Sequence, residues 1–289
     1  MNMQEHSSDF LSEKKIIFGL GDGDSMLIMD LLSPEDALTI FDKVKSEIRW
    51  NIMMHRGGPV PRLVCMQGKR ENGCEPIYRH PADEQPAFVD FTPTSEMLCK
   101  SVENIIHQKL NHALIQYYKG GDSYISEHSD KTLDVQIGTP IVNLSLGATR
   151  TMILKPKNKG ECKQKIKLPH NSLFVMGWNT NKKWLHSIKR DGRPESEKSA
   201  DETAFGGERI SYTFRTIGTF ATPDGKLFGQ GAKCKNLEDI IKSDIAEKTD
   251  DSLDMLKAFS IENHDPDFDW DLYYGKGFDS INFKTLSGV

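Results

Sequence analysis

The stretch "SYISEHSDKTLD" (residues 123–134) decides how this 289-residue chain is interpreted. It reads as an extended segment, and side chains two residues apart on a strand point to the same face. His128 and Asp130 are therefore expected to converge on one point. An isolated His-x-Asp pair is often incidental in a long chain, so the pair alone leaves open that both residues are ordinary surface residues.

The sequence around this stretch predicts an all-β core. Gly, Pro or Asn clusters separate most of eight short apolar or alternating runs: "ALIQYY", "SYISEHSD", "IVNLSLG", "RTMILKPK", "KIKLP", "SLFVMG", "WLHSIKR" and "RISYTFRTIG". Short strands at this spacing are typical of an antiparallel sandwich or barrel, here of the jelly-roll type.

Helical patterns precede and follow these runs. Residues 31–48 carry apolar side chains near helical spacing, with Ser33 as a plausible N-cap and Pro34 at the first helical position. Residues 95–110 return to the same spacing, and the chain beyond Gly231 contains further helical pieces. The predicted class is α+β, with helices at both ends of a β core.

Composition limits the cellular setting. No stretch approaches the ~20 apolar residues that a membrane-spanning helix needs, so we expect no membrane partner. The first residues, "MNMQEHSSDF", do not form a secretory signal, and the five cysteines are scattered without a Cys-x-x-Cys pair. These features predict a protein of the nucleus or cytoplasm that is not secreted.

Charge is unevenly distributed along the chain, although the net charge is only -5. Residues 150–193 hold twelve Lys or Arg against two acids, whereas residues 236–289 hold thirteen acids against five lysines. The basic region is expected to contact nucleic-acid phosphates, or else to be a solvated lysine-rich edge. The acidic tail is expected to cover the β core or to bind a protein partner.

A third metal ligand is available in "WLHSI", which supplies His186 on a strand-like run. Two imidazoles and one carboxylate on one face leave three positions of an octahedral ion open. This arrangement suits non-heme Fe(II) with a co-substrate and dioxygen.

The run "ERISYTFRTIG" predicts an anion site. Arg209 and Arg215 are six residues apart, which puts them on one face of a strand together with Ser211 and Thr213. Two inward guanidinium groups are costly unless an anion meets them, and a dicarboxylate would satisfy both. The alternative is an exposed strand face with salt bridges.

Four motifs in register carry a resemblance to a known family: "NHALIQYYKGGDSYISEHSDKT", "IVNLSLGATRTMIL", "WLHSI" and "RISYTFR". Over about residues 55–222 the chain resembles the AlkB family of Fe(II)/2-oxoglutarate dioxygenases, in particular its eukaryotic nucleic-acid repair branch, and its tail resembles those of fungal members. The resemblance implies a double-stranded β-helix (jelly-roll, cupin-like) core. Together with the loose, polar look of the first 20 residues and the acidic composition of the tail, it divides the chain into a flexible terminus (1–20), a dioxygenase domain (21–230, β core about 111–222) and an acidic C-terminal extension (231–289).

The resemblance also implies roles for residues. His128, Asp130 and His186 would hold iron, while Arg209 and Tyr118 would bind the distal carboxylate of 2-oxoglutarate. Arg215 would lie by the other carboxylate of 2-oxoglutarate, the one that chelates the metal together with the keto oxygen. The remaining cofactor contacts would come from Gln116 and Ser211, which stand where the family often has Asn, and from Thr213.

The implied reaction is oxidative removal of an N-alkyl group from a DNA or RNA base, with dioxygen consumed and succinate, CO₂ and an aldehyde released. Arg62 in "VPRLVCMQG" would contact a phosphate or stack on a base, and Tyr78 in "IYRHP" would add an aromatic lid. Some repair members discriminate the base with an acid two residues after the metal Asp, and here that position is Thr132, so base choice is not carried over.

Two other functions stay open from the sequence alone. One keeps the catalytic core but acts on a protein side chain or a small metabolite, which the net negative charge favours. The other is a binding module that has lost turnover. We expect a monomer whichever function holds.

Overall fold

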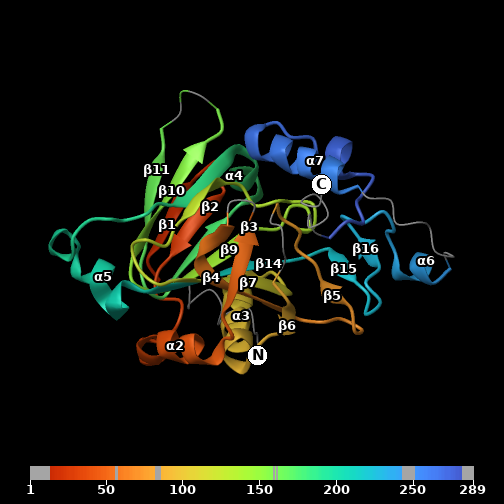
Figure 1. Ribbon diagram of the computed structural model, residues 1–289. Coiled ribbons are helices and arrows are strands. Elements are labelled where there is room, and N and C mark those ends of the chain that lie inside the picture. Colours follow the sequence, from red (N-terminus) through yellow and green to blue (C-terminus); the bar gives the residue numbers. More distant parts are fainter. Residues whose placement is uncertain are drawn as a thin grey trace, which may run out of the picture.

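The computed structural model describes residues 14–55, 58–81, 86–158, 160, 162–242 and 251–281. Two antiparallel sheets form its core, as predicted for a jelly roll (Figure 1). In Figure 1, α7 lies above this core, whereas α2 and α3 lie below it.

The larger sheet has the strand order β1-β2-β12-β9-β14-β7-β4-β3, with β6 pairing in parallel to β4. Its strands are β1 (Ile16–Leu20), β2 (Ser25–Ile28), β3 (Asn51–His55), β4 (Gly58–Gly68), β6 (Phe88–Asp90), β7 (His112–Tyr118), β9 (Ile141–Gly147), β12 (Ser172–Met176) and β14 (Arg209–Arg215).

The smaller sheet has the order β11-β10-β13-β8, and a third sheet has the order β16-β15-β5. Their strands are β8 (Ile125–His128), β10 (Arg150–Pro156), β11 (Gln164–Leu168), β13 (Trp184–Ile188), β5 (Glu75–Pro76), β15 (Thr219–Ala221) and β16 (Leu227–Gly229).

The helices lie at both ends of the chain and between strands. They are α2 (Pro34–Glu47), α3 (Pro93–Ile106), α4 (Trp178–Lys183), α5 (Ala200–Thr203), α6 (Leu237–Lys242), α7 (Ser252–His264) and α8 (Trp270–Tyr274), with 3₁₀ turns at Glu195–Glu197 and Ala204–Gly207. No helix of the described residues has the length and apolar character needed to cross a bilayer.

The predicted start of α2 is confirmed. The Ser33 hydroxyl accepts a hydrogen bond from the Asp36 N–H, and Pro34 occupies the first turn, where its missing N–H costs nothing. The helix buries Ile40, Phe41 and Val44. Leu38, which helical spacing assigned to the same face, is 79% exposed. The buried stripe is therefore narrower than the sequence predicts.

The central strands of the larger sheet are buried on both faces, because α2 and α3 cover one face and the smaller sheet covers the other. On β14, the apolar side chains Ile210, Tyr212 and Phe214 pack into the helix-side core. The alternate residues Arg209 and Arg215 turn to the opposite face, where they line the inter-sheet cavity. Strand periodicity thus separates a structural face from a chemical one.

The C-terminal extension packs against the core, as one of the two sequence interpretations proposed. Phe268 and Tyr274 are buried in a cluster with residues of α7, and Trp270 and Tyr273 pack against it. The same cluster contains Leu133 of the β core. A partner-binding role for the acidic tail stays a prediction, as do the domain boundaries.

The N-terminal prediction needs one correction. Residues 1–13 lie outside the described residues, but β1 occupies residues that were assigned to a flexible terminus. It pairs with β2 at the edge of the larger sheet, with Ile17 opposite Leu27. A strand therefore forms within the stretch that its polar composition marks as flexible.

Candidate active site

Strand register brings the candidate residues together. In the smaller sheet, His186 of β13 pairs directly with His128 of β8. In the larger sheet, Arg209 of β14 pairs with Tyr118 of β7, and Ser211 pairs with Gln116. The two sheets therefore present a histidine pair and an arginine-tyrosine pair to the same interior.

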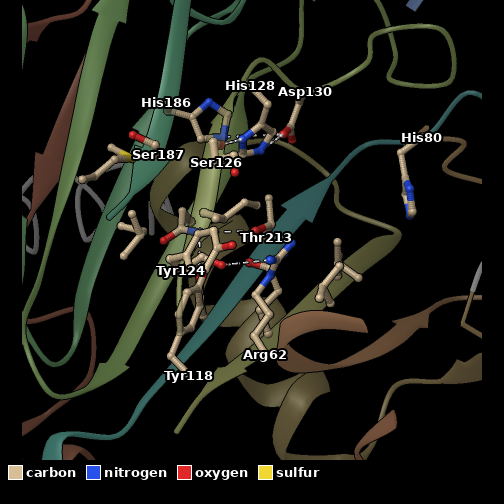
Figure 2. Close-up of a pocket in the computed structure, with 18 of the residues that line it drawn as sticks. Arg62, His80, Tyr118, Tyr124, Ser126, His128, Asp130, His186, Ser187 and Thr213 are labelled. Carbon is tan, nitrogen blue, oxygen red and sulfur yellow. Dashed lines mark hydrogen bonds and ion pairs between the residues drawn. The ribbon is translucent and has the colours of Figure 1, made fainter. Parts of the chain in front are cut away.

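His128, Asp130 and His186 form a ligand set for a metal ion, since one ligand atom from each lies within 4.8 Å of the others. The Nε2 atoms of His128 and His186 are 3.7 and 3.6 Å from Asp130 Oδ1. Figure 2 shows the three side chains turned toward one another at one end of the pocket. β8 ends at His128, so Asp130 comes from the loop after the strand and not from the strand itself.

The protonation states suit metal binding, which requires neutral imidazoles and an ionised carboxylate. Burial, together with the neighbouring His186, lowers the pKa of His128 to about 3. Burial also lowers the pKa of His186. For Asp130, burial alone would raise the pKa, but Arg215 and the two imidazoles outweigh it and bring the pKa below its ordinary value.

The hydrogen bond on the far side of one imidazole fixes which nitrogen is available. Nδ1 of His128 lies 2.8 Å from the Ser126 carbonyl oxygen and donates to it in the tautomer that leaves Nε2 free. Metal-bound histidines commonly hold their second nitrogen in this way. The chemistry of the donor set therefore fits a divalent ion such as Fe(II).

Arg215 meets an anion supplied by the protein. Its Nε donates to Asp130 Oδ2 at 3.0 Å, and its guanidinium carbon lies 3.9 Å from the centre of the Tyr78 ring. The sequence places Arg215 beside a carboxylate of the co-substrate, but the partner in the structure is the candidate metal ligand. Oδ1 of Asp130 is left to face the histidines, so Arg215 orients the carboxylate.

Arg209 meets no carboxylate among the residues that the structure describes. The residue is 1% exposed, and its Nε and Nη1 atoms find no hydrogen-bond acceptor in that part of the chain. Only Nη2 is engaged, chiefly by Ser145 Oγ at 2.7 Å. Burial lowers the pKa of Arg209 to about 10, which still leaves the group charged at neutral pH. A buried cation with two free donors is the expected partner of a carboxylate ligand.

Asn143 of β9 connects the polar residues around Arg209, and sequence reasoning missed it. Its amide nitrogen donates to Ser211 Oγ at 2.7 Å and to Thr213 Oγ1 at 3.2 Å, while its oxygen accepts from Arg209. On the next strand, the Tyr118 hydroxyl donates to the Gln116 side-chain oxygen at 2.9 Å. The only signal for Asn143 was a polar letter inside the apolar run "IVNLSLG".

A cavity of about 450 Å³ joins these groups. Its walls include the three candidate ligands, all of the predicted cofactor contacts, and both predicted substrate contacts. Arg62 donates from Nη1 to the Tyr124 carbonyl oxygen at 3.0 Å, and both residues lie across the cavity from the histidines (Figure 2).

Two predicted residues have different places from those expected. Tyr78 is 3% exposed and lies against Arg215 in the cavity wall, so it is not a lid. Thr132 does not line the cavity. Its N–H and its hydroxyl both donate to Glu262 of α7 instead. The position at which some repair members discriminate the base therefore contacts the C-terminal extension in this chain.

Comparison with known proteins identifies the family. The model of the 2OG-Fe(II) oxygenase superfamily matches residues 24–215. The chain belongs to this superfamily. It is accordingly an oxidoreductase that uses Fe(II), 2-oxoglutarate and dioxygen, as the sequence predicts, and the predicted AlkB relationship is confirmed.

The relatives are distant. The chain is 27% identical to DNA oxidative demethylase ALKBH2 of Arabidopsis thaliana over 241 residues, which cover 73% of this chain and 71% of that protein. It is 33% identical to human DNA oxidative demethylase ALKBH2 over 132 residues, covering 43% of this chain and 46% of the human protein. The solved structure of OsALKBH1 superposes with a TM-score of 0.49 at 16% identity, covering 70% of this chain and 100% of that one.

Proposed function

We propose that this oxygenase removes N-alkyl groups from bases in DNA or RNA, releasing succinate, CO₂ and an aldehyde. One observation carries the proposal: the His-Asp-His set lines the same cavity as Arg209, a buried cation whose Nε and Nη1 have no acceptor among the described residues. The relatives support the substrate class, because they include proteins described as DNA oxidative demethylases and a tRNA demethylase of Schizosaccharomyces pombe.

The proposed roles follow the geometry. His128, Asp130 and His186 hold Fe(II), which supplies the oxidising chemistry with dioxygen when it is bound. Arg209, with Tyr118 at its side, binds the distal carboxylate of 2-oxoglutarate through Nε and Nη1. The walls of the cavity leave the co-substrate and the alkyl group in one enclosed space.

The protein's own residues contribute by orienting the groups around the metal and the co-substrate. Arg215 keeps Asp130 ionised and holds its Oδ1 toward the two imidazoles. Asn143 connects the Ser211 and Thr213 hydroxyls to Arg209 through its own hydrogen bonds. No side chain is needed as a general base, since the reaction breaks a C–H bond and the hydroxylated product then releases the aldehyde.

The substrate would approach through Arg62 and Tyr124, which is 39% exposed. An alkylated base turned out of a helix can stack on such an aromatic ring, while an arginine pairs with the backbone. The hairpin β10–β11 adds positive charge, because Lys165 and Lys167 are exposed. The segment that connects β10 to β11 begins after Pro156. Pro156 lies two residues after Leu154, whose partner on β13 is the candidate ligand His186.

A nucleic-acid substrate also fits the predicted location in the nucleus or cytoplasm. All five cysteines are free. Unpaired, scattered thiols are usual in a reducing compartment. We propose that the protein works there, and that it does so as a monomer.

The test is a mass-spectrometric screen of N-methylated single- and double-stranded DNA and RNA oligonucleotides, with methylated peptides of similar size as the other arm. Each reaction contains Fe(II), 2-oxoglutarate and ascorbate. We expect at least one oligonucleotide to lose the mass of a CH₂ unit for each repaired base, and none to do so when His186→Ala replaces the parent protein. Turnover of peptides alone would favour a protein hydroxylase or demethylase instead. An absence of succinate with every substrate would contradict both.

A further inference from the structure

The loop of residues 129–132, which carries the candidate ligand Asp130, is held almost wholly by side chains from elsewhere. Each of its four consecutive backbone N–H groups donates to a side-chain oxygen. The acceptors are Asn263 for Ser129 (3.0 Å), Asn181 for Asp130 (2.9 Å), the Tyr78 hydroxyl for Lys131 (3.2 Å) and Glu262 for Thr132 (2.9 Å).

Two of these four acceptors belong to the C-terminal extension. Asn263 stands in the last turn of α7, and its Oδ1 also accepts from Lys131 Nζ at 3.1 Å. Glu262 precedes it and is 4% exposed. Its second carboxylate oxygen accepts from the Tyr274 hydroxyl at 2.7 Å. A residue of α8 therefore holds the Glu262 carboxylate, which in turn holds the loop.

The remaining contacts come from the opposite side of the loop. Asn181 of α4 accepts from the Asp130 N–H and donates to the Asp130 carbonyl oxygen at 3.0 Å. Asn181 lies five residues before His186, so it ties two candidate ligands together through one short segment. The loop is thereby held between the β core on one side and α7 on the other.

The contacts with α7 have no role in the proposed chemistry, because Glu262 and Asn263 do not line the cavity. They satisfy backbone donors that would otherwise be buried without partners, which is unfavourable. Groups that orient metal ligands in this indirect way commonly set the affinity of the site.

We propose that the C-terminal extension completes the metal centre, with Asn263 and Glu262 acting as positioning residues for Asp130. In this view the extension is required for tight metal binding even though neither Asn263 nor Glu262 lines the cavity that holds the metal site. The inference goes beyond the proposed function, because it holds for any substrate of this oxygenase.

The test compares metal affinity with fold stability in the full-length chain. Asn263→Leu removes the acceptor for Ser129 at similar volume. Asn263→Asp keeps an acceptor oxygen and adds a charge next to Lys131. Asn236→Leu is the matched control, because Asn236 is exposed in the same extension and its side chain bonds locally, to Asp239 at 3.2 Å. Binding of Mn(II) is measured by calorimetry without substrate, and thermal unfolding is followed on the apoprotein.

We expect Asn263→Leu to weaken Mn(II) binding by about 10- to 100-fold, while Asn263→Asp and Asn236→Leu bind like the parent. Because the buried Ser129 N–H then has no acceptor, the Asn263→Leu apoprotein should melt somewhat below the parent, while it stays folded at the temperature of the titration and the other two variants melt like the parent. Equal Mn(II) affinity for Asn263→Leu and the parent would overturn the proposal, and so would an equal loss in Asn236→Leu.

If Asn263→Leu does not fold, Asn263→Ser is measured in the same way, since its shorter side chain cannot reach Ser129. Weaker Mn(II) binding by a folded Asn263→Ser supports the proposal, and unchanged binding overturns it. Failure to find a substrate would leave both results intact, because neither readout involves turnover.

Discussion

Replacement of Arg209 by Met should separate co-substrate binding from stability. The residue lines the cavity and is 1% exposed, and its Nε and Nη1 have no protein acceptor among the described residues. A hydrogen bond to a charged group contributes about 1.5–3 kcal/mol, so two lost bonds remove at least ~3 kcal/mol. That corresponds to about a hundredfold weaker 2-oxoglutarate binding, since each 1.4 kcal/mol is tenfold.

The free energy of unfolding of the Arg209→Met apoprotein should rise or stay constant. Arg209→Met removes a desolvated charge at similar volume, and such replacements are often neutral or stabilising. The hydroxyls that lose their donor keep a second partner, because Ser145 and Ser211 both bond to Asn143. The apoprotein should therefore unfold at the same denaturant concentration as the parent, or at a higher one.

The assay is calorimetric titration of 2-oxoglutarate into Mn(II)-loaded protein, with urea unfolding of the apoprotein in parallel. Arg190→Met is the matched control, because Arg190 is exposed and pairs with Asp122 on the surface. Unchanged 2-oxoglutarate affinity in Arg209→Met would refute the assignment of the distal carboxylate. A large loss of apoprotein stability would refute the interpretation of Arg209 as a cation that awaits a ligand.

Three further predictions concern the support of the site and its surface. Arg79→Met leaves the fully buried Asp134 carboxylate unpaired and should lower the free energy of unfolding by about 3–5 kcal/mol in urea titrations, whereas the double variant with Asp134→Leu should recover much of it. Asn181→Leu should weaken Mn(II) binding by about 10- to 100-fold without a matching loss in melting temperature; equal affinity would contradict the role of Asn181. The double variant Lys165→Gln with Lys167→Gln should make oligonucleotide affinity less dependent on salt. The slope of log affinity against log salt concentration should fall by about 1 for each phosphate that is no longer neutralised. An unchanged slope would show that β11 does not contact the nucleic acid.

The sequence predicts the strands and their chemical face because both follow from periodicity. The alternation in β14 separates Arg209 and Arg215 from the apolar residues between them, and this separation is observed. The cap of α2 was also predictable, because Ser33 and Pro34 act locally. Spacing and residue type are sufficient for such features, which depend on few distant contacts.

Partners from distant segments were not predictable. Two inward arginines imply two anions, but nothing in the chain indicates that Asp130 satisfies Arg215 while Arg209 is left for a ligand. Asn181 and Asn263 are single amides in polar stretches. No periodic pattern of the sequence relates them to the loop of residues 129–132. Thr132 shows the same limit, because its partner Glu262 is 130 residues away.

The central claim is that one site couples oxidation of 2-oxoglutarate to removal of an N-alkyl group from a base. Its most direct test counts products in a single reaction: succinate and repaired base, both quantified by mass spectrometry from one methylated oligonucleotide. We predict equal amounts of the two with the parent protein and neither with Asp130→Ala, whose loss of a carboxylate removes one metal ligand. Repaired base without succinate, or repair that persists in Asp130→Ala, would contradict the account.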